Sequence, residues 1–177
     1  MKKIMNENQD KKAIKDMLID IYPYLVIIIV VVLIRSFIIT PIRVNGDSME
    51  PTLNEGETMI LNKIGLHHGI NRYDIVVIDA VDDYIIKRVI GLPGDSVAHI
   101  EGKLFINGKA VEDIYSKTVT QDFDEVKLKE DEYFVMGDNR EVSKDSRMIG
   151  AVNIDQIKGK TNLILFPLSK FGILKHE

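Results

Sequence analysis

Three short segments of this 177-residue chain combine turn-forming residues with polar side chains that are able to do chemistry. They are residues 44–53 (VNGDSMEPTL), 83–97 (DYIIKRVIGLPGDSV) and 137–147 (GDNREVSKDSR). The chain has no cysteine, which excludes a disulfide framework, a thiolate nucleophile and every cysteine-based metal site. Its chemistry must therefore use oxygen and nitrogen groups.

Ser48 is the candidate nucleophile of the first segment. It follows Gly46 and Asp47 and precedes Met49-Glu50-Pro51, a bent context that presents the hydroxyl outside a regular ladder. If the preceding stretch is extended, Ile42, Val44, Gly46 and Ser48 share one face, so the serine lies at the end of an apolar groove. Taken alone, a serine in a turn more often satisfies a local backbone amide.

Lys87 is the candidate base of the second segment. In YIIKRVI, strand alternation places Lys87 on the same face as Ile85 and Val89. Apolar neighbours disfavour the ammonium form and lower the pKa, and a neutral lysine is a competent general base for a serine hydroxyl. The alternative is an edge-strand lysine that reaches into water and deters aggregation.

The third segment places Ser143, Asp145 and Arg147 at every second residue, after the turn that begins at Gly137. Such alternation fits a hydrogen-bonded and salt-bridged scaffold beneath an active site, or else an exposed ion pair of little energetic value.

His67 and His68 lie between two glycines and indicate a loop. A metal site is not expected there, because no carboxylate stands at a convincing ligand spacing.

The elements that position these residues begin with a very apolar stretch. Residues 21–39 read IYPYLVIIIVVVLIRSFII, and residues 25–34 are aliphatic without interruption. This length is close to the ~20 residues that cross a bilayer, and Arg35 lies near enough to the end to reach the headgroups. The stretch predicts one transmembrane helix. A buried core helix is the alternative, but no other helix in the chain is hydrophobic enough to surround it.

Flanking charge predicts the orientation of this anchor. Five lysines lie within residues 1–20, which favours a cytoplasmic N-terminus. No small-residue cleavage pattern follows the apolar core, so the anchor should persist. We therefore expect a basic cytoplasmic segment at 1–20, a transmembrane anchor at 21–39 and an extracytoplasmic domain at 40–177, where the lack of cysteine suits an oxidising environment.

The exported part reads as mainly β, because short apolar segments alternate with Gly, Asn, Asp and Pro. Expected strands are residues 57–62, 74–79, 84–90, 96–100, 103–106, 132–136 and 161–166, with a hairpin turn at Asn107-Gly108. Many short strands must hide their edges, so we expect a folded, barrel-like core. Residues 112–131 are charged and weakly patterned, which indicates a surface excursion.

Charge argues against one class of partner. Residues 40–177 carry 17 basic and 23 acidic side chains, a net charge of −6. Nucleic acid is therefore not an expected partner.

With these segments in view, the chain resembles the type I signal peptidase (leader peptidase) family, in the short single-anchor form of Gram-positive bacteria. The resemblance covers nearly the whole chain: an apolar anchor, then GDSMEPTL, RYDIVV, YIIKRVIGLPGD and GDNREVSKDSR, in the family's order. It implies a membrane-bound serine endopeptidase that removes signal peptides from exported preproteins. It further implies work at the lipid bilayer near the secretion translocon, with no metal or other cofactor.

The resemblance also implies residue roles. Ser48 is the nucleophile and Lys87 the general base of a Ser/Lys dyad. Ser143 is expected to hydrogen-bond and orient Lys87, and Asp145 and Arg147 to pair. The turn around Ser48 is expected to be shaped by Met49 and Pro51. Residues expected to pack close to the site are Gly137, Asp138 and Asn139, and those expected to line shallow pockets for small substrate residues are Ile42, Val44, Met49 and Ile86.

Two departures from the family pattern qualify this expectation. Some members have a serine two residues before the nucleophile as an oxyanion-hole donor, where this chain has Gly46. The hole would then rest on the Ser48 backbone N–H with a neighbouring amide or water; one lost donor is worth ~3 kcal/mol. The chain is also too short for the large second β domain of longer members, and residues 112–131 are expected to be its reduced counterpart.

Two other functions fit parts of the sequence. The first is a catalytically silent, membrane-anchored β module that recognises exported or pilus proteins, against which the presence of both Ser48 and Lys87 argues. The second is self-cleavage as in phage-type repressors, which needs a cleavable linker and a DNA-binding domain that the sequence lacks.

Overall fold

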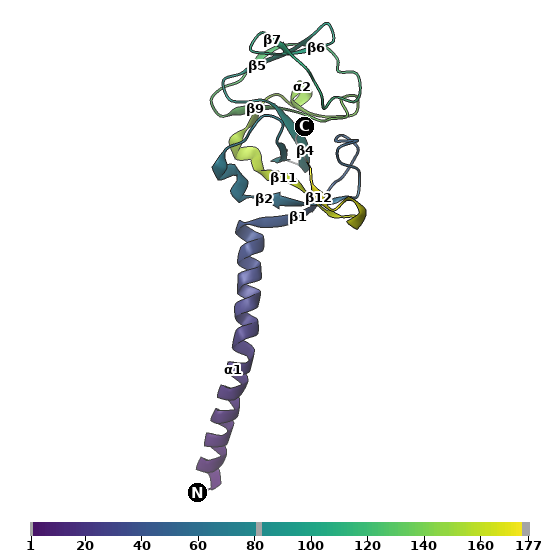
Figure 1. Cartoon of the computed structure of the whole chain (residues 1–177). Coiled ribbons are helices and arrows are strands. Elements are labelled where there is room, and N and C mark those ends of the chain that lie inside the picture. The colour runs from purple at the N-terminus through teal and green to yellow at the C-terminus, as the bar shows by residue number, and fades with distance from the viewer. Residues whose placement is uncertain (1, 81–82, 175–177) are drawn as a thin grey trace. The chain divides into compact units, whose positions relative to one another are not determined.

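The computed structural model describes residues 2–80 and 83–174, without the side chains of residues 2–14, 16, 67 and 68. The chain divides into two compact units, one ending at Ile38 and one beginning at Ile39. Each is described by itself (Figure 1).

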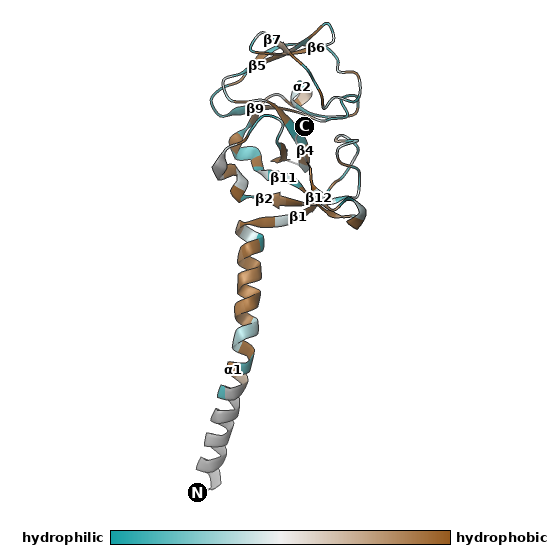
Figure 2. Ribbon diagram, viewed as in Figure 1, coloured by the Kyte–Doolittle hydropathy of each residue, from teal (hydrophilic) through white to brown (hydrophobic). Residues whose placement is uncertain are grey.

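The first unit is a single helix, α1 (Lys2–Phe37). Its part from Met17 to Phe37 is long and apolar enough to cross a membrane, and none of that part is buried within the protein. Figure 2 shows the apolar residues gathered along the C-terminal half of α1. The predicted helix is therefore present, and its exposure argues against a buried core helix. The helix ends at Phe37, so Ile39, which we had expected in the span, instead begins the first strand.

The second unit is mainly β, as the sequence predicts. Its larger sheet has the order β1-β2-β11-β3-β4-β9-β10, with β12 paired to β11, and its smaller sheet the order β7-β6-β5-β8. The strands of the larger sheet are β1 (Ile39–Arg43), β2 (Thr58–Asn62), β3 (Ile75–Asp79), β4 (Tyr84–Gly91), β9 (Glu132–Met136), β10 (Val152–Asn153), β11 (Ile157–Phe166) and β12 (Gly172–Ile173). Those of the smaller sheet are β5 (Ser96–Ile100), β6 (Lys103–Ile106), β7 (Lys109–Val111) and β8 (Phe123–Lys127). The short helices are η1 (Ile64–His68), α2 (Ser146–Ile149), η2 (Ile154–Gln156) and η3 (Leu168–Lys170).

The larger sheet curls around a groove. Five neighbouring strands, β1, β2, β11, β3 and β4, each contribute side chains to one cavity of about 530 Å³. A flat sheet would not bring Thr40 of β1 and Ile86 of β4 to the same cavity, since three strands lie between them. This curvature confirms the expected barrel-like core. It also brings β1 and β4, which are not neighbours in the sheet, to the same cavity.

All seven expected strands are present, and most of their bounds agree with the structure; three ends differ by one residue, and β11 begins four residues earlier than expected. The Asn107-Gly108 turn joins β6 to β7, with Asn107 and Gly108 both at positive φ. The short strands β1, β7, β8, β10 and β12 were not expected, because runs of two to five residues carry little alternation.

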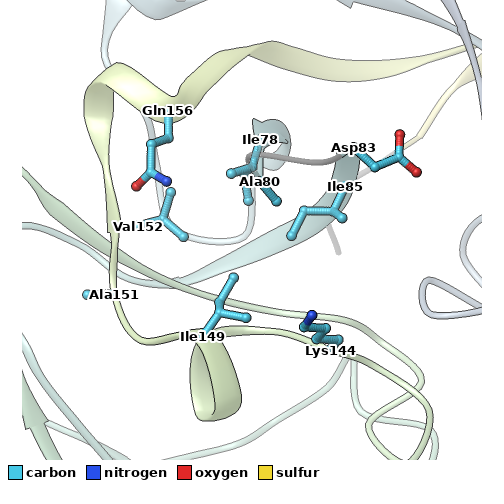
Figure 3. A pocket seen from close by; sticks show the side chains of 9 residues that line it. All are labelled: Ile78, Ala80, Asp83, Ile85, Lys144, Ile149, Ala151, Val152 and Gln156. Atoms are coloured by element: carbon cyan, nitrogen blue, oxygen red, sulfur yellow. The ribbon is translucent and has the colours of Figure 1, made fainter.

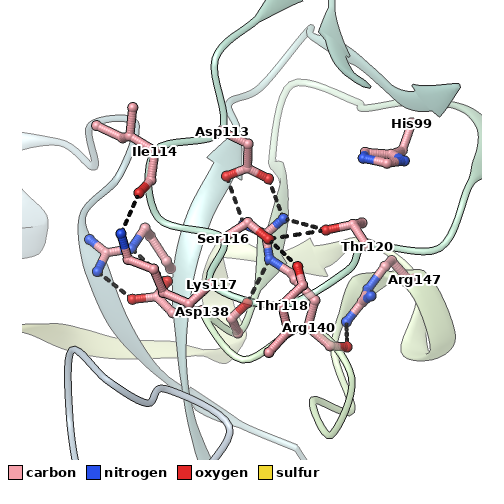
Figure 4. A network of polar contacts seen from close by, with 12 residues as sticks. His99, Asp113, Ile114, Ser116, Lys117, Thr118, Thr120, Asp138, Arg140 and Arg147 are labelled. Carbon is pink, nitrogen blue, oxygen red and sulfur yellow. Dashed lines mark hydrogen bonds and ion pairs between the residues drawn. The ribbon is translucent and has the colours of Figure 1, made fainter. Parts of the chain in front are cut away.

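The interpretation of residues 112–131 as a surface excursion is only partly right: most of the segment is exposed, but it contains a strand and makes buried contacts. Phe123–Lys127 forms β8 and pairs with β5, and Asp113 and Thr120 bind the buried guanidinium of Arg140 (Figure 4). The segment reads as surface because it is rich in charge, yet one of those charges neutralises a buried cation. The smaller sheet is thus built mostly from residues 96–111, and residues 112–131 supply only its last strand.

A buried ion pair joins the larger sheet to the segment after β9. The Arg88 guanidinium on β4 donates to both carboxylate oxygens of Asp138, at 2.8 and 2.6 Å. Both side chains are almost fully buried, and the Arg88 guanidinium also lies 3.7 Å from the ring centre of Tyr115. Thr52 donates to the same carboxylate at 2.5 Å. Four segments that are far apart in the sequence therefore meet at this ion pair.

Replacing Asp138 by alanine should lower the free energy of unfolding by about 3–5 kcal/mol, because a buried guanidinium then lacks its counter-charge. Denaturant unfolding of the detergent-solubilised chain measures this. Lys127→Ala, which removes an exposed partner 3.8 Å from Glu125, is the matched control and should change little. Equal midpoints for Asp138→Ala and wild type would show that the pair does not hold the fold.

Candidate active site

Ser48 lies in a tight turn that follows β1. Hydrogen bonds from Val44 N to Glu57 O (2.8 Å) and from Glu50 N to Asp47 O (3.0 Å) fix the backbone on either side of it. Gly46 has φ +80° and nothing within 4 Å of the position a Cβ would take, so backbone conformation rather than space requires glycine. The same conformation explains why a serine at position 46 would be strained here.

Lys87 reaches this turn from β4, 39 residues further along the chain. Its Nζ lies 2.7 Å from Ser48 Oγ and donates a hydrogen bond to it. The Lys87 side chain is only 3% exposed, and Val89 on the same strand face belongs to the adjacent apolar cluster, with Ile85 packed against it. The structure therefore brings the two predicted dyad residues together and buries the amine.

Burial lowers the pKa of Lys87 from its ordinary value of 10.5 to about 8. Desolvation is the largest cause, since an ammonium is stabilised less in an apolar site than in water. The charge of Asp145 raises the pKa and that of Arg147 lowers it, so these two partly cancel. Near pH 8 a large fraction of Lys87 is therefore neutral and able to accept a proton.

The segment after β9 holds the serine turn in place. Asn139 donates its backbone N–H to Ser48 O at 3.1 Å and its side-chain amide to Asp47 O at 3.3 Å. Gly137 packs so tightly that an added Cβ would lie under 3.0 Å from Ser48 O and from Ser143 Oγ. Gly137 and Asn139 thus border the turn directly, as expected, whereas Asp138 acts through its pair with Arg88.

Asp145 and Arg147 form the expected ion pair, with two contacts of 2.8 Å each. Asp145 also caps α2 by accepting from Arg147 N, and accepts from Gly137 N at 3.0 Å. Burial alone would raise the pKa of Asp145, but the hydrogen bonds from Arg147 and Gly137 lower it below its usual range. The carboxylate is therefore a fixed anion that positions Gly137 beside Ser48.

Ser143 does not make the expected hydrogen bond to Lys87. Its Oγ is buried and has no hydrogen-bond partner within the described part of the chain. Its Oγ instead lies against Gly137 and beside Asp145, whose pKa it helps to lower. Ser143 is therefore close to the site without orienting the amine in this structure.

The four expected pocket residues line two connected cavities. Val44, Met49 and Ile86 lie with the dyad in a cavity of about 240 Å³. Ile42 and Ile86 line the 530 Å³ groove of the curled sheet. The two cavities share four lining residues, Asn45, Asp83, Tyr84 and Ile86, so the groove leads to Ser48.

Sequence reasoning missed two buried arginines that support the site. Arg88 follows Lys87 on β4. The sequence feature that could have indicated its burial is its place on the same strand face as Ile86 and Ile90. Arg140 donates from Nε to Gly137 O at 2.8 Å, and Arg147 donates to Arg140 O at 2.7 Å (Figure 4). Each arginine is far in sequence from the carboxylate that binds it, Arg88 from Asp138 and Arg140 from Asp113. Residue spacing therefore does not reveal either pair.

His67 and His68 fall in η1, but their side chains lie outside what the structure describes. Among the residues that it does describe, no group of three metal-ligating side chains gathers.

Gly137→Ala should lower the free energy of unfolding by about 1–3 kcal/mol, because the added methyl group overlaps Ser48 O and Ser143 Oγ. Adding Ser143→Gly should restore part of the loss, which a double-mutant cycle measures. Gly65→Ala is the control, since its methyl would lie 3.1 Å from Lys160 Cε and 3.4 Å from the Asn62 side chain, without the overlap found at Gly137. An unchanged stability in Gly137→Ala would contradict the close packing described here.

Comparison with known proteins finds a family model and relatives that match most of the chain. A family model described as signal peptidase, peptidase S26, matches residues 18–166. A signal peptidase I of Bacillus amyloliquefaciens is 37% identical over 180 residues, which cover 94% of this chain and 97% of the relative. A signal peptidase IB of Staphylococcus aureus is 38% identical over 184 residues, which cover 91% and 94%. A crystal structure of a signal peptidase I from Enterococcus faecalis is 33% identical and covers 51% of this chain and 95% of that one, with a TM-score of 0.46. This chain belongs to the signal peptidase family, peptidase S26.

Proposed function

We propose that this chain is a membrane-anchored signal peptidase that cleaves signal peptides from preproteins with Ser48 as nucleophile and Lys87 as general base. The observation that carries the residue assignment is the 2.7 Å hydrogen bond between Ser48 Oγ and a buried amine whose pKa is about 8. A serine hydroxyl needs an adjacent base to become a nucleophile, and no other base contacts Ser48 among the described side chains.

The geometry supports a two-stage acyl transfer. Neutral Lys87 takes the Ser48 proton as the Oγ attacks the scissile carbonyl, and the resulting ammonium gives that proton to the leaving amine as the C–N bond breaks. Lys87, neutral again, then takes a proton from a water molecule that attacks the acyl-enzyme ester. The backbone N–H of Ser48 is the proposed donor to the oxyanion.

The groove suits an extended signal peptide. β1 pairs with β2 along one edge, and β4 pairs with β9 only from Arg88 onward, so among the described strands β1 and the Tyr84–Lys87 part of β4 each keep an open edge. A substrate strand laid against such an edge gains backbone hydrogen bonds, and its alternate side chains enter pockets. Ile42, Val44, Met49 and Ile86 then form shallow apolar surfaces for small residues before the cleaved bond.

The anchor places the enzyme where its substrates are. We propose that α1 spans the bilayer with its lysine-rich N-terminus in the cytoplasm and the β unit outside. Preproteins leaving the translocon also hold their apolar segment in the membrane, so sharing that surface raises the effective concentration without new contacts. A catalytically silent module is not favoured, because the dyad is intact and hydrogen-bonded.

Ser48→Ala and Lys87→Met should each lower kcat/KM on a purified preprotein by at least about a thousand-fold, because the first removes the nucleophile and the second its base. Gel-based conversion of preprotein to mature protein by detergent-solubilised enzyme measures this. Lys127→Met, an equivalent change at an exposed lysine of β8, should leave the rate unchanged. Full processing by either dyad variant would overturn the assignment.

The rate should depend on pH through Lys87. Below a pKa of about 8 the amine is protonated, so kcat/KM should fall tenfold per pH unit, and above it the rate should level off. A pH series with one preprotein at constant ionic strength tests this. A rate that is flat from pH 6 to about pH 9 would mean that Lys87 is not the base.

A further inference from the structure

A third cavity lies on the other face of β4, and the mechanism proposed above does not use it. It measures about 310 Å³ and is lined by Ile78, Ala80, Asp83, Ile85, Lys144, Ile149, Ala151, Val152 and Gln156 (Figure 3). Its floor is apolar, because Ile78 and Val152 belong to a buried core cluster on which Ile85 packs. We refer to it as the Ile85-side cavity.

The Ile85-side cavity is continuous with the dyad. It shares Asp83, Ile85 and Lys144 with the cavity that contains Ser48 and Lys87. The groove proposed for the signal peptide meets the same dyad cavity through Ile86 and Tyr84. Because Ile85 and Ile86 are neighbours on a strand, they point to opposite faces, and the two cavities approach the dyad from opposite sides of the β4 edge.

The chemistry decides which side of the substrate enters which cavity. Lys87 must give its proton to the leaving amine, and that nitrogen belongs to the first residue of the mature protein. The Lys87 side chain lies on the Ile85 face of β4, so the leaving amine has to be on that face too. The chain that follows the amine then continues toward the Ile85-side cavity, while the signal peptide occupies the Ile86 side.

We infer that the Ile85-side cavity binds the first few residues of the mature protein, and that Lys144 at its rim favours an acidic side chain among them. This inference rests on the proposed function of Ser48 and Lys87. It adds a specificity determinant on the mature side of the cleaved bond. The apolar floor of the cavity accepts one substrate side chain, and Lys144 at the rim attracts a negative charge on a neighbouring substrate residue.

Lys144 is placed to attract a negatively charged substrate side chain. It is exposed, it has no ion-pair partner among the described residues, and Figure 3 shows its amine directed toward the lining side chains Ile149 and Ile85. Asp83 also lines the cavity but forms no ion pair with Lys144: its carboxylate accepts from Tyr84 N at 2.7 Å and points away from the cavity in Figure 3. An anionic substrate side chain near Lys144 therefore meets an ammonium group that no described carboxylate pairs with.

The test uses one preprotein in which Glu or Lys replaces each of the first few mature residues in turn. Wild type should favour the Glu substrate over the Lys substrate about threefold in kcat/KM at one of these positions, and Lys144→Glu should reverse that preference, a change of about ten-fold in the ratio. The ratio should shrink at high salt. Lys127→Glu carries the same charge change on β8 and should keep the wild-type ratio.

The outcomes separate the two proposals. The cavity inference alone is overturned if wild type cleaves and Ser48→Ala does not, but Lys144→Glu leaves the ratio of kcat/KM between the Glu and Lys substrates unchanged at every position. Equal cleavage by wild type and Ser48→Ala overturns the proposed function.

A second measurement tests direction without relying on charge. A photo-crosslinking residue at the mature side of a preprotein, incubated with Ser48→Ala to prevent turnover, should attach to Ile149, Ala151 or Gln156, which are accessible lining residues. Attachment instead to Thr40 or Leu61 of the signal-peptide groove would overturn the inference.

Discussion

The burial of one lysine amine against one serine hydroxyl is the constraint on which the rest of the β unit depends. Lowering the pKa of Lys87 from 10.5 to about 8 corresponds to roughly 3 kcal/mol of lost stabilisation of its charged form. That cost falls on the fold whenever the amine is protonated. The surrounding structure must therefore be rigid enough to keep the amine out of water and beside Ser48.

The neighbouring charges are arranged so that Lys87 alone can become neutral. Three arginines close to the site are each bound by their own carboxylate: Arg88 by Asp138, Arg147 by Asp145 and Arg140 by Asp113. A permanent guanidinium needs such a partner when it is buried, whereas an ammonium can lose its proton instead. Lys87 makes its described hydrogen bond to a hydroxyl and not to a carboxylate, which leaves its pKa low.

These pairs also connect segments that are far apart in the chain. The Asp113–Arg140 pair ties the segment before β8 to the Gly137 loop, and that loop holds the Ser48 turn through Asn139. The segment between β7 and β8 thus helps to position Ser48, the proposed nucleophile, although no strand of the smaller sheet lines the dyad cavity. The same sheet curvature that closes the core opens a path past the dyad on both faces of β4.

Much of this could be predicted from the sequence, because it is local. Strand alternation placed Lys87 among aliphatic residues, the Asn107-Gly108 pair marked a hairpin, and the uninterrupted apolar stretch marked α1. The expected hydrogen bond of Ser143 failed because the direction of its hydroxyl depends on packing against Gly137, which spacing does not encode. The buried contact of residues 112–131 could not be predicted for a related reason: the sequence shows Asp113 as a charge, and only the fold shows the buried arginine that it neutralises.

The central claim is that Lys87 is neutral when the site works, and the ionisation of its amine tests this directly. NMR titration of lysine side chains labelled at the ε-carbon in the detergent-solubilised chain, with Lys87 assigned by the signal that Lys87→Met removes, gives its pKa. The account predicts a midpoint of about 8, well below the exposed lysines. A midpoint near the ordinary 10.5 would contradict it, because the amine would then be charged throughout the range in which it has to act as a base.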